Sequence, residues 1–460
     1  MAAINDNNSM QETDNVIAIA GGGIVGLTLA LALHRRFVVA AAADATTSTD
    51  RPPLISRIDI YEKARDTATD TGAGMSMYPN GLRVLRDIGL LDDVQALGVT
   101  YQHRQWTQSH MPPPSSSAGD DATATSMMQQ DNDDPDNQDE NNLRPMGMCR
   151  WKLQRLLQER VREAYPVIQI HHNAAVVGAE MISHDNQQQH VRIELVDGQV
   201  CQAAVLFGCD GAKSALRRVL LGPALENPLH YTGVTCLMGL ATAHDNHFQG
   251  IRQVSSSLSH AKDHHRHHRN GTHAVFFPVS TDQVCFQFHV PTTEAAADAL
   301  NWGNLSQAAS RRECQQLAAT LRATGEWDEA YLQVLEDPTV RAVRIGFQQL
   351  ARPLHLWTAG HVALLGDAAH PPTPYIGQGA QQGLEDVGVC VALLEHYCYD
   401  KVQHKMNWDN HFLKAMTLYE AIRAPRSAQV LELSLYVGAC QAVGGLDPLV
   451  LKGEILMNGG

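Results

Sequence analysis

The sequence predicts an α/β protein built on a parallel β-sheet, and three stretches of the chain lead to this prediction. Each stretch is a short apolar run, then a turn rich in glycine or containing Gly-Asp, then a segment with the composition of a helix. Repeated strand–turn–helix units are typical of doubly wound sheets, in which the turns gather at the carboxyl edge of the strands. The three stretches are 16–36, 205–220 and 361–394.

The first stretch reads VIAIAGGGIVGLTLALALHRR and raises the question of a membrane segment. Acidic residues precede its apolar run, 16–33, and His34, Arg35 and Arg36 follow that run, which is the reverse of a signal peptide. Three consecutive glycines would also weaken a spanning helix by roughly 1 kcal/mol each. A G-x-G-x-x-G turn at Gly21, Gly23 and Gly26 accounts for every feature. The first such glycine allows a tight turn, the second lets the backbone approach a pyrophosphate, and the third lets the helix pack closely on the strand. We therefore expect a dinucleotide site and no transmembrane segment.

A dinucleotide site of this kind needs an acid at the end of the second strand to bind ribose hydroxyls. The segment 57–61 is a predicted strand and is followed by Glu62. This acid lies further from Gly26 than the usual spacing of about 20 residues. The polar segment 41–56 accounts for the difference as a surface loop. The alternative is that Glu62 is a solvated charge at a strand end.

Composition limits the partners and the compartment. The net charge is −14, which argues against nucleic acid as a partner because phosphate binding needs a basic surface. The nine cysteines form no C-x-x-C pair, so we expect free thiols and a cytoplasmic protein. The histidines of 260–273 lie in a low-complexity stretch, and we expect a solvated loop there and no metal site.

The second and third stretches repeat the strand–turn–helix pattern. In the second, a strand leads to Asp210 and Gly211, and a helix begins through Ser214. In the third, a strand ends at Gly366-Asp367, a proline-rich loop follows, and a helix begins near Gly377. A carboxylate such as Asp367 can accept hydrogen bonds from hydroxyl groups, and each such bond contributes roughly 1.5–3 kcal/mol. The alternative is that Asp367 caps the start of a helix.

These three motifs, in this order, resemble the FAD-dependent aromatic monooxygenases with the para-hydroxybenzoate hydroxylase fold. The segment GDAAHPPTPYIGQGA is most similar to the salicylate hydroxylase-like branch. The resemblance implies a Rossmann-like FAD-binding domain (GR2-type), an inserted antiparallel β-sheet substrate domain and a C-terminal helical tail. We expect a monomer or a homodimer.

The resemblance assigns cofactor roles to individual residues. Glu62 would hold the adenosine ribose, Gly74 would pass close to FAD, and Arg150 would contact the flavin chain. Asp210 and Gly211 would serve both FAD and NAD(P)H. The remaining residues would lie around the flavin: Gly366, Asp367, Gly377, Gly379 and Ala380.

Between the second and third motifs the chain is rich in predicted strands, at 231–243, 273–280 and 283–291. Relatives frequently carry an arginine where this chain has Met238, so an anionic substrate would lose a partner. The substrate region is predicted from this residue and three aromatic ones: Met238, Phe276, Phe277 and Phe286. Neighbouring residues of a strand face opposite sides, so only one of Phe276 and Phe277 can line a cavity.

The predicted domains follow from these motifs. A discontinuous FAD-binding domain takes 14–95, 145–225 and 350–400, and the substrate domain takes 226–349. Segments 113–142 and 254–272 are expected to be disordered insertions, because they lack apolar residues to bury. The C-terminal helical region is 401–460.

The resemblance implies an FAD-dependent monooxygenase that uses NADPH or NADH as electron donor. Reaction with O₂ would give a flavin hydroperoxide, which would hydroxylate or epoxidise a small aromatic or unsaturated substrate. No side chain identifies itself as the catalyst of oxygen transfer. Two alternatives stay open: an FAD-dependent reductase or oxidase without oxygen insertion, and a non-catalytic flavin-binding protein.

Overall fold

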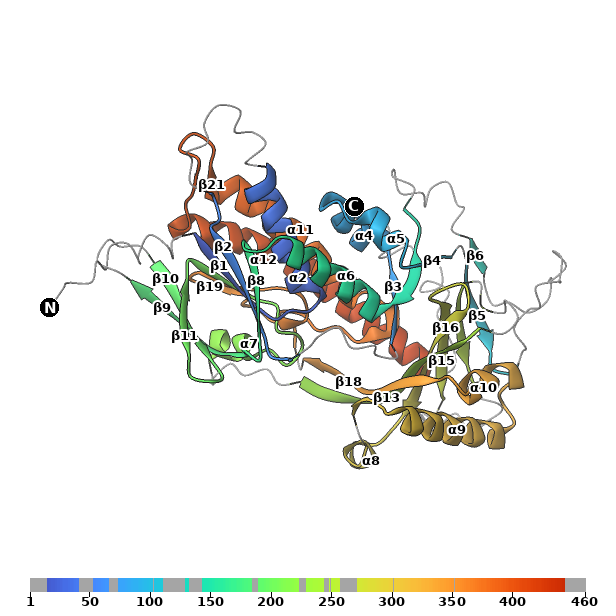
Figure 1. Cartoon of the computed structure of the whole chain (residues 1–460). Helices are drawn as coiled ribbons and strands as arrows, with labels where there is room; N and C mark the ends of the chain where they lie inside the picture. The colour runs from blue at the N-terminus through green and yellow to red at the C-terminus, as the bar shows by residue number, and fades with distance from the viewer. Residues whose placement is uncertain are drawn as a thin grey trace.

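The computed structural model describes residues 15–40, 53–65, 73–101, 103–110, 129–131, 143–183, 189–222, 229–243, 248, 250–256, 271–300, 302–350 and 352–442. Two β-sheets and a layer of helices dominate this part of the chain (Figure 1). No helix in these ranges is both long and apolar enough to cross a bilayer.

A six-stranded sheet forms the centre of the first half of the fold. Its order is β19-β20-β12-β1-β2-β8, and every pair is parallel except β19 with β20. The strands are β1 (Val16–Ala20), β2 (Arg57–Glu62), β8 (Ile168–His172), β12 (Val205–Gly208), β19 (Thr358–Ala359) and β20 (Val362–Leu364). Because β20, β12 and β1 are neighbours, the three predicted turns leave the same edge of the sheet.

Helices cover one face of this sheet and a small antiparallel sheet covers the other (Figure 1). Helix α2 contains no charged residue before its last turn, since it packs against the sheet and between α6 and α11. The helices of this layer are α2 (Ile24–His34, continued by a π-helical turn, η1, Arg35–Val39), α4 (Pro79–Asp87), α5 (Leu91–Gln95), α6 (Arg150–Glu163) and α11 (Gly379–Cys398). The opposite face carries β9 (Val176–Ser183), β10 (Gln189–Leu195), β11 (Val200–Ala203) and α7 (Ala215–Leu221).

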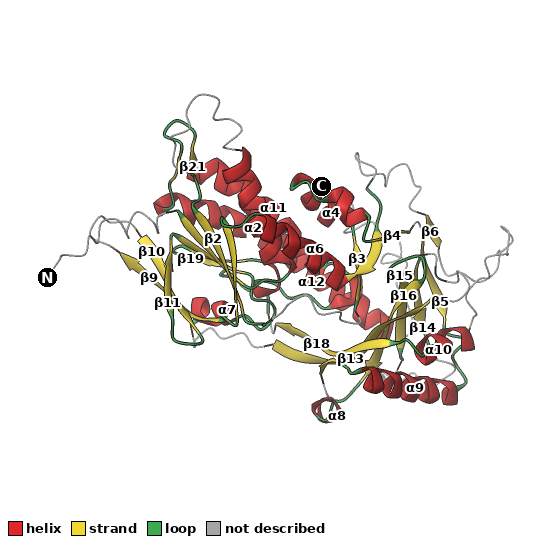
Figure 2. Cartoon of the chain, viewed as in Figure 1, coloured by secondary structure: helices red, strands yellow, loops and turns green. Residues whose placement is uncertain are grey.

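An eight-stranded sheet forms the second half of the fold, in the order β17-β18-β13-β16-β15-β14-β5-β6 (Figure 2). All pairs are antiparallel except β14 with β5. Its strands are β5 (His103–Gln108), β6 (Gln129–Asp131), β13 (Leu229–Thr242), β14 (Ile251–Ser255), β15 (His273–Pro278), β16 (Gln283–Pro291), β17 (Gly303–Asn304) and β18 (Arg341–Leu350).

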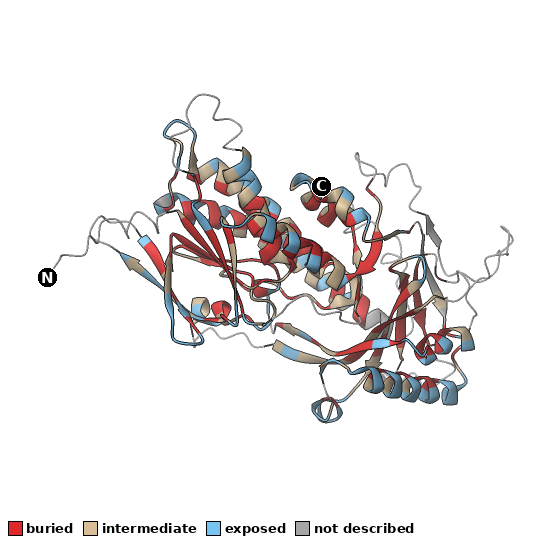
Figure 3. Cartoon of the chain, viewed as in Figure 1, coloured by how far each residue is buried: buried red, intermediate tan, exposed pale blue. Residues whose placement is uncertain are grey.

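The two faces of the eight-stranded sheet have different neighbours. One face packs on α9 (Gln307–Thr324) and α10 (Glu329–Glu336), with the short α8 (Glu294–Asp298) near its edge. The other face meets a three-stranded sheet of β3 (Gly74–Met77), β7 (Met146–Cys149) and β4 (Gly98–Thr100). Buried residues run through both sheets and the helices between them (Figure 3).

Strand alternation sends the large aromatic residues of this sheet to the helix side. Phe276 stacks on Tyr331 of α10 with ring centroids 5.4 Å apart, and it meets Phe288 edge to face at 5.6 Å. Phe286 belongs to the same fully buried cluster. Phe277 points to the other face, beside Cys285.

The structure differs from the predicted insertions at three places. Within 113–142, residues Gln129–Asp131 form strand β6, which pairs with β5. Residues 254–255 belong to strand β14, since their backbone pairs with β15. His273 does not lie in a solvated loop but is buried in β15, with its Nδ1 atom hydrogen-bonded to Ser255 Oγ at 2.9 Å. Ser256 and Thr272 are also ordered, since the Ser256 N–H donates to the Thr272 carbonyl oxygen at 3.1 Å, and the other residues of 113–142 together with 257–270 lie outside the described part.

The C-terminal region begins with a short hairpin, β21 (Tyr399–Asp400) with β22 (Lys405–Met406), and continues as the long helix α12 (Asp409–Ala442). Helix α12 packs along α11 and reaches the loop that follows β20. Residues 443–460 lie outside the described part.

Replacement of Phe276 by alanine tests the helix-side core. We expect Phe276→Ala to lower the free energy of unfolding by about 3–5 kcal/mol, because it leaves a cavity among closely packed rings. Denaturant titration followed by circular dichroism measures this loss. A variant as stable as the wild type would contradict this description of the core.

Candidate active site

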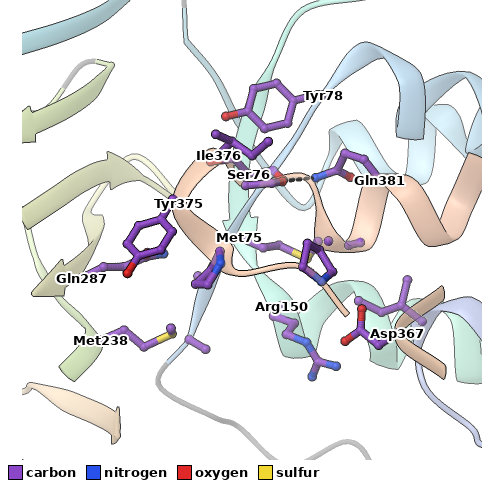
Figure 4. A pocket seen from close by; sticks show the side chains of 18 of the residues that line it. Met75, Ser76, Tyr78, Arg150, Met238, Gln287, Asp367, Tyr375, Ile376 and Gln381 are labelled. Atoms are coloured by element: carbon purple, nitrogen blue, oxygen red, sulfur yellow. Dashed lines mark hydrogen bonds between the residues drawn. The ribbon is translucent and has the colours of Figure 1, made fainter. Parts of the chain in front are cut away.

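A cavity of about 460 Å³ lies between the two halves of the fold. Its walls come from the turn after β1, strand β3, the start of α6, the turn after β12, the loop 365–381 and the strands β13–β16 and β18 (Figure 4). This volume falls within the range of small-molecule sites, about 300–1,000 Å³.

The cavity brings many of the predicted site residues together, from distant parts of the chain. Ten of them line it: Gly23, Gly74, Arg150, Gly211, Met238, Phe277, Asp367, Gly377, Gly379 and Ala380. Seven do not line it: Gly21, Gly26, Glu62, Asp210, Phe276, Phe286 and Gly366. Of the pair Phe276 and Phe277, of which only one was expected in the cavity, Phe277 lines it. Phe286 was placed wrongly, since it packs with Phe276 against helices on the opposite face of the sheet.

The three glycines of the first turn differ in their surroundings. A Cβ on Gly21, whose φ is 104°, would lie 2.3 Å from the carbonyl oxygen of Cys209. A Cβ on Gly26 would lie 2.0 Å from the carbonyl oxygen of Gly21, so this glycine allows the helix to pack on the turn. A Cβ on Gly23 would meet nothing within 4 Å, and this residue lines the cavity. The folded chain therefore requires glycine at positions 21 and 26, whereas Gly23 leaves open space beside the backbone.

Glu62 fixes the same turn from the end of β2. Its carboxylate accepts hydrogen bonds from the Gly22 N–H at 2.6 Å and the Ala64 N–H at 2.8 Å. The side chain is buried, so the alternative of a solvated charge is wrong. Glu62 thus lies directly beside the glycine turn, although outside the cavity.

The second motif caps a helix and leaves one acceptor atom unused. Asp210 Oδ2 accepts from the backbone N–H groups of Ala215 and Leu216 at 2.7 and 3.2 Å. Ser214 Oγ accepts from the Arg217 N–H at 2.9 Å, as expected for a helix beginning there. Asp210 Oδ1 is buried and has no hydrogen-bond partner among the described residues.

Arg217, which the sequence analysis missed, joins the second motif to the third. Its buried guanidinium donates to the carbonyl oxygens of Asp367 and Ala368 at 3.2 and 2.8 Å. It also donates to the carbonyl oxygen of Ala212. The sequence did contain a signal for this role: Arg217 follows Leu216 near the start of a helix, and an arginine that is buried there needs several acceptors.

Asp367 faces the cavity and does not cap a helix. No hydrogen bond links its carboxylate to another side chain or backbone N–H in the described ranges. Desolvation by the surrounding protein raises the pKa of Asp367, while the nearby His370 and Arg150 oppose this shift. Desolvation likewise lowers the pKa of Arg150, and the charge of Asp367 opposes that shift. The two groups form the charged end of the cavity (Figure 4).

A buried charge cluster holds the Gly366-Asp367 turn from behind. Asp386, on α11, accepts from the Gly366 N–H at 2.8 Å, from His370 Nε2 at 2.5 Å and from Arg423 Nε at 2.7 Å. Burial alone would raise the pKa of Asp386, but His370 and Arg423 outweigh it and hold the pKa below its usual value. His370 does not line the cavity, and its contact with Asp386 holds the loop that follows Asp367.

The opposite wall of the cavity is largely apolar. Met238 and Phe277 lie on it, and the sequence analysis missed its other members: Ile251, Gln253, Val275, Gln287, Ile345 and Tyr375. Gln287 was detectable in principle. The alternation of Phe286 and Phe288 marks the helix-side face of β16, so Gln287 between them had to face the other way.

These residues fit FAD. Open space beside Gly23 suits a pyrophosphate, because backbone can approach phosphate there without a side chain between them. The carboxylate of Asp367, which faces the cavity, is an acceptor suited to hydroxyl groups of the cofactor. Arg150 supplies a positive charge to the same region.

Comparisons with known proteins agree with this fit. Residues 13–398 match the family described as "FAD binding domain", and the chain belongs to that family. A 3-amino-4-hydroxybenzoate 2-monooxygenase of Streptomyces cremeus is 26% identical over 426 residues, covering 92% of this chain and 86% of the relative. An FAD-dependent urate hydroxylase of Mycolicibacterium vanbaalenii is 25% identical over 373 residues, covering 80% of this chain and 77% of the relative.

Solved structures show the same fold. A salicylate hydroxylase substrate complex superposes with a TM-score of 0.66 at 18% identity, covering 97% of this chain and 94% of the other. The probable monooxygenase PqsL of Pseudomonas aeruginosa gives a TM-score of 0.66 at 18% identity and covers 95% and 98%. The chain is thus an oxidoreductase of the FAD-dependent monooxygenase class, which confirms the fold class, family and FAD cofactor expected from the sequence.

Substitution of Gly23 separates FAD binding from folding. We expect Gly23→Ala to fold normally, because its φ is −78° and its Cβ would meet no atom. FAD affinity should fall about ten- to a hundred-fold, since the methyl group occupies the space needed by the pyrophosphate. Flavin content per folded protein, measured by absorbance, gives the answer.

Gly26→Ala is the matched comparison, and it should lose soluble yield because its Cβ would collide with the Gly21 carbonyl oxygen. Full FAD occupancy in Gly23→Ala would refute the assignment of this turn.

Substitution of Asp367 tests the raised pKa. The ionised carboxylate is unfavourable in the folded protein above its raised pKa, so Asp367→Asn should raise the melting temperature of the FAD-free protein at neutral pH. The difference should disappear as pH falls through the raised pKa toward 3.8.

As the pH falls over the same range, the Asp367 carboxylate becomes protonated, so the FAD affinity of the wild type should decline. The FAD affinity of Asp367→Asn should not change with pH. Scanning calorimetry and flavin titration at several pH values measure both. A lower melting temperature for FAD-free Asp367→Asn would contradict the raised pKa.

Proposed function

We propose that the protein uses NADPH or NADH and O₂ to insert one oxygen atom into a small aromatic substrate, or into an alkene. One observation carries this proposal: a single cavity joins the FAD-binding residues, marked by Gly23 and Asp367, to an apolar wall that includes Met238 and Phe277. An apolar wall facing a flavin site suits an organic substrate, because it excludes water while it orients the ring.

The relatives support an aromatic substrate class. Their names specify 3-amino-4-hydroxybenzoate, urate and salicylate, which are all small and aromatic. The identities of 18–26% with these proteins do not transfer any one of these substrates to this chain.

The positions of the residues suggest which of them would bind the cofactor and which the substrate. When bound, reduced FAD supplies the electrons that activate O₂. The first glycine turn, Glu62 and Asp210 would hold the nucleotide part, while Asp367 and Arg150 would hold the chain leading to the flavin. Phe277 on the opposite wall would position the substrate ring and keep water away. No described side chain in the cavity is needed as an acid or base in this account.

The relatives do not favour the two alternatives. The named homologues are monooxygenases, which supports oxygen insertion and not reduction, oxidation or flavin binding alone. We retain a cytoplasmic location as a proposal, supported by the free cysteines of the described region. A monomeric or homodimeric state also stays a proposal.

The function is tested by stoichiometry. Phenolic compounds are screened for stimulated NAD(P)H oxidation, and NAD(P)H consumed, oxygenated product and hydrogen peroxide are measured together. We expect product for a good substrate; oxygen uptake recovered entirely as peroxide with every compound would favour an oxidase.

Phe277→Ala should raise the peroxide formed per NAD(P)H by several-fold while FAD stays bound, because a poorly held substrate misses the oxygen transfer. Phe276→Ala, the neighbour on the opposite face, is the control and should leave this ratio unchanged in the folded fraction. Equal ratios in both variants would remove Phe277 from the substrate site.

A further inference from the structure

The charged groups of the cavity are confined to one end. Among the lining residues that the structure describes, only Arg150 and Asp367 carry a charge. Both lie at the cofactor end, whereas Met238, Gln287 and Tyr375 lie together on the opposite side (Figure 4). The substrate end therefore offers hydrogen-bonding groups but no cation.

Two glutamines and two apolar residues form one row across the wall of the sheet. Met238 on β13 pairs with Gln287 on β16, which pairs with Val275 on β15, which pairs with Gln253 on β14. All four side chains line the cavity. Neighbouring strands lie about 4.8 Å apart, so the backbones that carry the two glutamines are about 10 Å apart, with Val275 between them.

This row has the chemistry of a site for a flat, neutral molecule. The amide of Gln287 provides two N–H donors and one oxygen acceptor, so it can hydrogen-bond hydroxyl, amino or carbonyl groups. The apolar residues between and beside the amides can contact a ring. A carboxylate buried here would lose its hydration without gaining a cation, which is costly.

We infer that the substrate is an uncharged aromatic molecule with a hydrogen-bonding group that meets Gln287, and that aromatic carboxylates are discriminated against. This inference rests on the proposed function, because it concerns the molecule that occupies the same cavity. Specificity arises partly from rejection, since the wall at Met238 leaves an anion without a partner.

The test compares compounds of nearly equal shape and different charge. Salicylamide is paired with salicylate, and 4-hydroxybenzamide with 4-hydroxybenzoate. Binding to the FAD-loaded protein is measured from the change in flavin absorbance, which does not require turnover. We expect each amide to bind at least about tenfold more tightly than its carboxylate partner.

Variants at Met238 test the electrostatic cause. Met238→Arg should tighten carboxylate binding about tenfold, whereas Met238→Glu should weaken it further, although both disturb packing to a similar extent. Met181→Arg adds the same charge on β9, outside the cavity, and should change the binding of neither the carboxylates nor the amides. An equal response to arginine and glutamate at position 238 would overturn the inference.

Variants of glutamine test the hydrogen bonds. Gln287→Leu should weaken binding of the amides about fivefold and leave FAD content unchanged. Gln348→Leu, on β18 of the same sheet but outside the cavity, should change nothing.

Two outcomes for the compounds would also overturn the inference: carboxylates that bind as tightly as the amides, and a failure of all four compounds to bind. Absence of oxygenated product with every compound, while the amides still bind preferentially, would instead contradict the proposed function and leave the inference standing.

Discussion

The buried carboxylate of Asp386 joins parts of the chain on which the whole site depends. It accepts hydrogen bonds from the turn after β20, from the loop that follows, and from Arg423 on α12. A charge without water nearby must be compensated by such partners, and few other arrangements of these segments would do so. The position of Asp367, and with it the charged end of the cavity, follows from this constraint.

The parts of the site that sequence predicted are those set by local backbone chemistry. Gly21 and Gly26 must be glycine because a Cβ would collide with neighbouring carbonyl oxygens, and such requirements leave a readable pattern. Strand β1 runs from Val16 to Ala20, as predicted, because its apolar run ends at the glycine turn.

The parts that sequence missed depend on which elements cover each face of a sheet. Strand alternation allowed only one of Phe276 and Phe277 into the cavity but did not say which one, and it placed Phe286 there wrongly, because Phe276 and Phe286 belong to the core that includes α10. Arg217 was missed because its acceptors lie about 150 residues further along the chain, on the loop after β20. Composition alone could not show that a helix layer occupies the aromatic face.

One further consequence concerns the far end of α12. A Cβ on Gly438 would lie 2.4 Å from the ring of Tyr375, and Ser434 on the same helix donates to the carbonyl oxygen of Thr373 at 2.6 Å. The helix therefore sets how far this tyrosine reaches into the cavity. Side-chain size at position 438, outside the cavity, would control the depth of the cavity, so a related protein could change its substrate size without altering any residue that touches the substrate.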